Sequence, residues 1–187
     1  MLRPKQPIYA RQCSVSVIDS HVADAFENMF HLQGRVRGQT VCLGLYLGEE
    51  LVQVMTFGNP RYNSKYQWEI LRLCSNSSYA VVGGAEKLWK YFIQNYSPKS
   101  VISYCDLSKF TGDIYERLGM HLMHVSDPAE VWSKGSEAVT SNLLRQRGYD
   151  QLFGTSYGKG SSNEELMLEN GWLPVFDCGQ SVYEWRS

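Results

Sequence analysis

The sequence predicts a single α/β (more closely α+β) domain whose central sheet is mixed and mostly antiparallel, with helices on its faces. Three observations lead to this fold class. The expected elements run helix, hairpin, strand, helix, strand, helix, strand along the chain. Its 187 residues are the size of one ordinary domain. Hydrophobic residues make up 43% and charged residues 20% of the chain, which is enough apolar material for a core.

The first half of the chain contains a helix, a hairpin and a strand. Residues 20–32 place apolar side chains at helical spacing behind a Ser/Asp entry, which predicts a helix. Residues 40–47 and 50–57 flank a Gly-Glu turn and predict a β-hairpin. A further strand is expected over residues 67–74, where Trp68 and Ile70 face a core.

The second half alternates between strands and helices. Residues 81–96 change from a strand-like pattern to a helical one, with apolar side chains on a single stripe. After a Ser-Pro break we expect a strand over 100–104, a helix over 111–118 that ends at Gly119, and a strand over 121–125. Near the end of the chain we expect a helix over 163–169 and a closing strand over 180–185.

Residues 133–162 differ in composition from the rest of the chain. They are rich in Gly and Ser and carry more basic than acidic side chains. We interpret them as a loop-rich insertion on the surface of one domain that spans residues 1–187. A short helix is expected within the insertion, near residues 137–147.

The charge pattern argues against a general polyanion binder but leaves room for a basic face. The net charge is only −1, yet Arg3, Lys5 and Arg11 lie in the first twelve residues without an acid, whereas residues 161–187 are acidic. Because a phosphate backbone responds to local charge, a basic face can coexist with a neutral total.

The cysteines and the hydropathy predict a cytoplasmic protein. The five cysteines lie far apart without a C-x-x-C pair, and their odd number is typical of reduced thiols. No apolar run approaches the ~20 residues of a membrane span, and the N-terminal residues lack the apolar stretch of a signal peptide. We therefore expect no membrane partner.

The segment from Val82 to Glu86 is a candidate phosphate-binding loop. Val82, Gly83, Gly84, Ala85 and Glu86 leave a strand and open a helix, where unpaired backbone amides and the helix dipole favour an anion. Neither a Walker nor a G-x-G-x-x-G pattern is present, which disfavours nucleoside triphosphate and dinucleotide sites. The alternative is a tight turn into a packed helix.

Asp106 and Tyr115 are candidate catalytic residues. Asp106 directly follows a buried strand, at the end where open α/β sheets bind their ligands, and could be a base or an orienting acceptor. Tyr115 on the next helix could donate a proton into the same crevice. The alternatives are a helix cap or loop ion pair for Asp106 and a half-buried core tyrosine for Tyr115.

Arg72 and His31 complete the catalytic candidates. Arg72 and Glu69 lie three residues apart on one expected strand, so regular alternation places them on opposite faces, with Arg72 beside Ile70 and Cys74. Arg72 could bind a carboxylate, a phosphate or an adenine ring nitrogen, or form a structural ion pair. His31 ends the first helix and is a ligand, a base or a helix cap. The four histidines show no metal-site spacing, so no metal is predicted.

These segments resemble the GNAT acyltransferase fold and, more specifically, the Mom family of bacteriophage DNA-modification proteins. The GNAT layout is a strand, a V-x-G-x-A loop opening a helix, another strand, and a helix ending in Y-x-x-x-G. The Mom-like pieces fall within residues 20–125 and are 30–31 with Gly34, 43–60, 69–73, 103–106 (SYCD) and 112–120 (GDIYERLGM). The stretches LRLCS, VVGGA and YCDLSKF are also similar to uncharacterised domains that accompany phage homing endonucleases.

The resemblance implies a transferase that protects phage DNA from restriction in the cytoplasm of a bacterial host. The group transferred to the N6 amine of adenine would be of the acetamido (carbamoylmethyl) type, with acetyl-CoA or a related acyl donor as the cofactor. Asp106 would accept a proton from the N6 amine, and Tyr115 would protonate or stabilise the leaving group. Leu73 and residues 82–86 would hold the cofactor.

The partner implied by this activity is DNA, with the target adenine flipped out of the helix or taken from an open strand. Interleaved basic and aromatic residues are typical of nucleic-acid grooves. The candidate DNA contacts are Arg61, Tyr62, Lys65, Arg145, Arg147 and Lys159. The alternatives are a non-catalytic DNA-binding module beside a homing endonuclease and an acetyl-CoA-dependent N-acetyltransferase for another amine.

Overall fold

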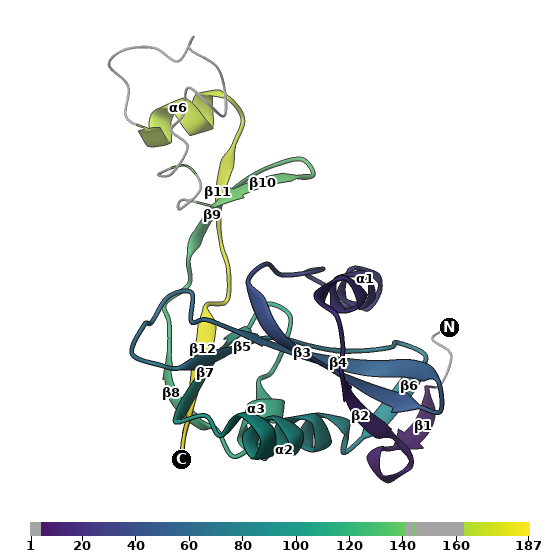
Figure 1. Cartoon of the computed structure of the whole chain (residues 1–187). Helices are drawn as coiled ribbons and strands as arrows, with labels where there is room; N and C mark the ends of the chain where they lie inside the picture. The colour runs from purple at the N-terminus through teal and green to yellow at the C-terminus, as the bar shows by residue number, and fades with distance from the viewer. Residues whose placement is uncertain (1–4, 141–143, 145–162) are drawn as a thin grey trace. The chain divides into compact units, whose positions relative to one another are not determined.

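The computed structural model describes residues 5–140, 144 and 163–187 (Figure 1). The chain divides into two compact units. The larger contains the described residues within 1–105, 112–124 and 182–187, and the smaller contains those within 106–111 and 125–181. Three of the expected DNA contacts, Arg145, Arg147 and Lys159, lie outside the described residues.

The larger unit is built on a sheet with the strand order β2-β3-β4-β5-β7-β12-β8. Strands β2 to β5 pair antiparallel, and β5 pairs parallel with β7. The expected mixed, mostly antiparallel sheet is therefore confirmed. The strands are β2 (Ser14–Val17), β3 (Gln39–Leu47), β4 (Glu50–Gly58), β5 (Trp68–Ser75), β7 (Ser100–Asp106), β8 (His121–Val125) and β12 (Gln180–Arg186).

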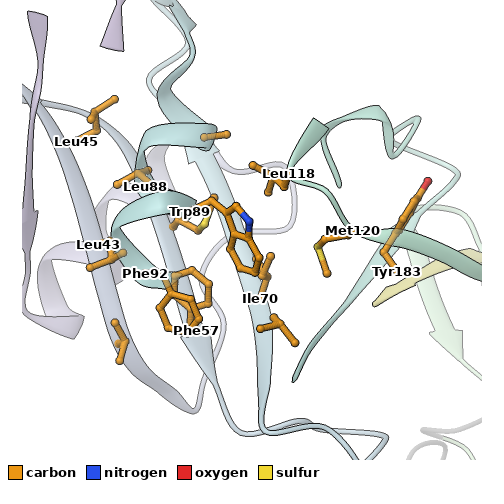
Figure 2. Packing of buried hydrophobic residues seen from close by; sticks show 14 of the residues in the cluster. Leu43, Leu45, Phe57, Ile70, Leu88, Trp89, Phe92, Leu118, Met120 and Tyr183 are labelled. Carbon is orange, nitrogen blue, oxygen red and sulfur yellow. The ribbon is translucent and has the colours of Figure 1, made fainter. Parts of the chain in front are cut away.

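Helices cover both faces of this sheet, as Figure 1 shows for α1 (Ser20–Phe30) and α2 (Gly84–Tyr96). The main core lies under α2, where Leu88, Trp89 and Phe92 pack on the sheet. The rings of Phe57 and Phe92 stack with centroids 3.6 Å apart (Figure 2). The short helix α3 (Asp113–Arg117) leads to Leu118 and Met120 in the same core.

Helix α1 buries a narrower face than its sequence suggests. Ala23 and Phe26 pack with Cys42, Val54 and Cys74 on the other face of the sheet. Part of the apolar stripe expected for this helix points to solvent instead: Val22, Ala25 and Met29 are exposed. The buried face instead includes a charged residue, Glu27, which is fully buried.

A β-bulge in β5 changes which side chains share a face. Thr56 pairs with Arg72 but Phe57 pairs with Ile70, so Leu71 is an extra residue in β5. The expected placement of Arg72 beside Ile70, and opposite Glu69, is therefore wrong. Glu69 lies opposite Gly58 and Arg72 opposite Thr56, two positions of β4 with the same parity, so both charged side chains lie on the α1 face.

The N-terminal segment forms structure for which the sequence pattern gave no prediction. Strand β1 (Gln6–Tyr9) pairs parallel with β6 (Tyr79–Val82), and the short 3-10 helix η1 (Ala10–Gln12) leads into β2. Ile8 contributes to the main core, which explains why this segment is ordered. Among the described helices, none is long and apolar enough to cross a membrane.

The smaller unit contains a three-stranded antiparallel sheet with the order β10-β9-β11. Its strands are β9 (Glu130–Lys134), β10 (Glu137–Thr140) and β11 (Leu173–Phe176), and it also contains α6 (Asn163–Glu169). The helix expected from residue 137 is wrong over 137–140, because β10 pairs with β9 and places Val139 opposite the buried Trp132. The predicted helix over 163–169 is confirmed.

Gly112 provides a test of this packing. It caps α3 with φ +86°, and a Cβ at this position would overlap the hydroxyl of the buried Tyr183, whereas Gly119 has φ +77° with nothing within 4 Å of its Cβ position. Replacing either glycine by Ala costs about 1 kcal/mol because of the left-handed backbone. We expect Gly112→Ala to lose roughly 1–3 kcal/mol more, through overpacking. Urea unfolding measures both, and equal losses would contradict the packing described here.

Candidate functional site

The first feature of the site is the point where the ladder between β5 and β7 ends, here called the β5–β7 opening. These parallel strands pair only at Trp68 with Val101 and at Glu69 with Ile102. Where the ladder stops, the hydroxyl of Ser103 donates a hydrogen bond to the carbonyl of Ile70 at 3.3 Å. Beyond this point the two strands present backbone groups without mutual ladder bonds, which a ligand with amide groups can use.

Tyr115 reaches this opening from α3. A hydrogen bond joins its side chain to that of Ser103, and burial raises the pKa of its phenol. Its ring stacks on that of Tyr183, with centroids 5.0 Å apart. The side chain is therefore held in place and carries its proton at neutral pH, so it can act as a proton donor.

Arg72 lies on the α1 face with most of its hydrogen-bonding capacity uncommitted. Its Nε donates to the carbonyl of Gly34 at 3.1 Å and its Nη1 to that of Leu71 at 3.0 Å. Within the part of the chain that the structure describes, no carboxylate lies within 4 Å of it, so the structural ion pair considered from the sequence is not formed. Because a guanidinium has five N–H donors, it can bind an acceptor of a substrate.

His31 is neutral at physiological pH. Burial, followed by the positive charge of Arg72, lowers its pKa to about 4. Its Nδ1 accepts a hydrogen bond from the backbone N–H of Gln33 at 3.1 Å, which places the proton on Nε2. His31 does follow α1 as its C-cap residue, but the cap is made by its backbone N–H rather than by a cationic side chain. This neutral side chain is suited to donating a hydrogen bond.

Glu27 is a functional candidate that the sequence analysis missed. Its Oε1 accepts from the hydroxyl of Thr56 at 3.0 Å, and its Oε2 accepts from the backbone of Val36 at 3.2 Å and the amide of Gln39 at 3.0 Å. Burial raises its pKa, and the charge of Arg72 opposes that shift. An acid on the core-facing side of an amphipathic helix was the signal that could have identified it.

A second buried carboxylate, Glu69, holds Arg61 and an aromatic pair. Glu69 accepts from the Nε, Nη2 and backbone N–H of Arg61 at 2.9, 2.6 and 2.7 Å. The Arg61 guanidinium lies over the ring of Tyr62, which also contacts the edge of Tyr104. Arg61 thus faces a buried acid, which weakens it as a phosphate contact, whereas Tyr62 is 74% exposed.

Asp106 belongs to the smaller unit and is engaged in a local turn. Its Oδ1 accepts from the backbone N–H of Ser108 at 3.0 Å and from its hydroxyl, and its Oδ2 contacts the Lys109 ammonium at 2.5 Å. Burial would raise its pKa, but these bonds outweigh burial and lower it. The geometry favours the loop ion pair, and a role as base stays a prediction.

The loop over residues 82–86 offers backbone donors to a phosphate. Gly83 is the N-cap of α2 with φ +74° and no side-chain cap. A Cβ on Gly83 would make an ordinary contact with the Cβ of Ala10 at 3.6 Å, whereas a Cβ on Gly84 would overlap Gln53 and Val81. Lys87 donates to the carbonyls of Ala10 and Cys13, so its charge is committed elsewhere. The backbone amides of this loop fit an anion, whereas Glu86 places an acidic side chain in the first turn of the helix.

The positive charge of Arg72 acts on the pKa of His31 and on that of Tyr115. Tyr115 and the partly buried Leu73 both pack beside the main core. Lys65 is exposed in the turn before β5. Within the described ranges, no three His, Cys, Asp or Glu side chains gather into a metal site.

Comparison with known proteins gives structural relatives only. No family model matches the chain, and no curated protein matches its sequence. Solved structures that match include a Bacillus subtilis acetyltransferase in complex with CoA, at 12% identity and TM-score 0.52, which covers 94% of this chain and 99% of that one. An IAA acetyltransferase from Bacillus cereus matches at 9% identity and TM-score 0.53, with 94% and 99% covered. The ribosomal-protein-S18-alanine N-acetyltransferase from Escherichia coli matches at 9% identity and TM-score 0.52, with 93% of each chain covered.

These likenesses confirm the expected GNAT fold. Each extends over nearly the whole of both chains, so the arrangement of the elements is shared rather than a local motif. At 9–12% identity, these likenesses show the fold alone.

The neutral His31 predicts a pH dependence of stability. Its folded pKa of about 4 lies below the ordinary histidine value of 6.5, so as the pH falls below 6.5 the unfolded chain binds a proton before the folded one. The free energy of unfolding therefore decreases from about pH 6.5 to about pH 4. We expect His31→Gln to flatten this decrease, as measured by urea unfolding across the range. His124→Gln, an exposed histidine on β8, controls for loss of an imidazole, and an unchanged slope in His31→Gln would contradict the assignment.

Proposed function

We propose that this protein transfers an acyl group from an acyl-CoA thioester, acetyl-CoA or a related donor, to an amine. The observation that carries the proposal is the β5–β7 opening with the Tyr115–Ser103 pair at its edge. An opening of this kind accepts an extended amide-containing arm, and the loop over 82–86 offers backbone donors to its diphosphate. The shared acetyltransferase fold supports the same proposal.

The residues of the site meet the needs of this reaction. The amine nitrogen attacks the thioester carbonyl carbon, a C–N bond forms and the C–S bond breaks. The leaving thiolate takes the proton of Tyr115, which is available because burial raises the pKa of that phenol. Solvent reprotonates Tyr115, and the proton lost by the amine goes to solvent or to a carboxylate. The products are the amide and the free thiol.

We further propose that the amine belongs to a nucleobase of DNA, with N6 of adenine as the first candidate because of the Mom-like segments. Tyr62 supports this proposal. Its exposed ring is held by Tyr104 and Arg61, and Arg61 is itself fixed by the buried Glu69. A fixed, exposed aromatic ring is a stacking surface for an unpaired base. The uncommitted N–H groups of Arg72 could then hydrogen-bond to a ring nitrogen of that base.

Tyr115→Phe separates donor binding from chemistry. We expect acetyl-CoA to raise the melting temperature of this variant as much as that of the wild type, because the variant removes only one hydroxyl. The transfer rate should fall by about 100-fold or more, since a positioned general acid contributes roughly that factor. Thiol release with an adenine-containing single-stranded oligonucleotide as acceptor measures the rate.

Tyr91→Phe, on α2, is the matched control and should keep the wild-type rate. A melting temperature that does not respond to acetyl-CoA would contradict the donor part of the proposal. Thiol release with spermidine but not with the oligonucleotide would contradict the DNA part and leave the acyltransferase in place.

A further inference from the structure

The end of α1 and the loop after it carry large apolar side chains in full contact with solvent. Met29 and Leu32 are each 74% exposed, and they flank the partly buried His31. Isolated exposed apolar residues are common on protein surfaces. Two that lie three residues apart beside a candidate site need an explanation.

The segment that carries these side chains, residues 29–37, is held by side chains on both sides. The Asn28 side chain accepts from the backbone N–H of Arg35 at 3.1 Å, and Glu27 accepts from that of Val36. Within the segment, His31 accepts from the backbone N–H of Gln33, and Arg72 donates to the carbonyl of Gly34. Four consecutive backbone positions are therefore fixed, which is unusual for an exposed connection and indicates that its shape matters.

The charge around this segment suits a polyanion. Arg35 and Arg37 are exposed on either side of the buried Val36. Arg35 pairs with Asp24 at 2.9 Å; the Arg35 side chain is 48% exposed and that of Asp24 is 22% exposed, so water partly screens the pair. No acid occurs between residues 28 and 48, so the two arginines face solvent without a neighbouring carboxylate of the same segment.

The position of the segment connects it to the substrate. His31 and Arg72 belong to the candidate site and also hold this segment. His31 accepts a hydrogen bond from the backbone of Gln33, and Arg72 donates one to the backbone of Gly34. Any group presented to Arg72 therefore lies beside residues 31–34. A base taken out of a duplex leaves a gap in the stack, and proteins that open stacked DNA fill such gaps with apolar side chains.

We propose that residues 29–37 form a DNA wedge, in which Leu32 and Met29 enter the stack that the target base leaves while Arg35 and Arg37 contact the flanking phosphates. This inference rests on the proposed action on DNA. It assigns the opening of the duplex to α1 and its loop, and the stacking of the extruded base to Tyr62.

The test compares duplex and single-stranded DNA, because only a duplex has to be opened. The wild type and the Met29→Ala/Leu32→Ala double variant are titrated with a fluorescein-labelled 30-base-pair adenine-rich duplex and with one of its strands, at fixed salt. We expect the double variant to bind the duplex about tenfold or more weakly, since unstacking a step is costly without a wedge. Its affinity for the single strand should stay within twofold of the wild type. Val22→Ala, an exposed apolar residue at the other end of α1, is the matched control.

A duplex with a central abasic gap adds a second readout, because it is already unstacked and should restore binding by the double variant. Equal affinity of wild type and double variant for the intact duplex would overturn the wedge. Equal losses on duplex and single strand, with unchanged melting temperature, would overturn it too, because the segment would then be a general contact.

The outcomes for the wedge and for the proposed function are distinguishable. A wild type that binds neither form of DNA removes the wedge and the DNA part of the function, whereas acetyl-CoA stabilisation would still support the acyltransferase. A duplex-specific loss in a protein that shows no transfer would support the wedge and contradict the transferase.

Discussion

The candidate site depends on one irregularity, the extra residue Leu71 in strand β5. Without it, regular alternation would direct Arg72 toward the apolar core under α2, where Ile70 and Phe57 lie. The bulge turns Arg72 to the α1 face and leaves Ile70 in the core. Gly58 on the neighbouring strand is closely packed: a Cβ there would overlap the backbone oxygen of Gly38 and would also come within 2.8 Å of the Leu71 side chain. Bulges of this kind commonly redirect a side chain at a functional site.

Two buried carboxylates offset part of the cost of burying the charged guanidinium of Arg72. Glu27 and Glu69 are each fully buried, and each lies near enough to Arg72 to favour its charged form. Neither forms a direct ion pair with it: Glu27 is hydrogen-bonded to Thr56, Val36 and Gln39, and Glu69 holds Arg61. Arg72 thus gains electrostatic support without losing its N–H donors, which is the arrangement that a binding residue needs. Burial, aided by the same positive charge, keeps His31 neutral by lowering its pKa.

Local sequence patterns predicted much of the fold, because helices, strands and turns depend mainly on residues close together along the chain. The Gly48-Glu49 hairpin, the β6-to-α2 junction and the strand that follows α2 all depend on local periodicity and turn residues. The bulge at Leu71 could not be predicted in this way, because it is defined by the register of β4 against β5. The apolar side of its helix could have pointed to Glu27, but its partners could not be predicted in this way, since Thr56 and Gln39 come from other elements. Asp106 shows the opposite case: its neighbours Ser108 and Lys109, visible in the sequence, already favoured a turn.

The proposed modification of a DNA base is tested by nucleoside mass spectrometry of plasmid DNA from bacteria that express this chain. Plasmid from cells expressing Tyr115→Phe at the same level is the reference. We expect the wild-type sample to contain a new adenine nucleoside of increased mass, and the reference sample to contain much less of it. Unmodified DNA in both samples, from soluble and folded protein that responds to acetyl-CoA, would contradict this proposal and assign the acyltransferase to a different amine.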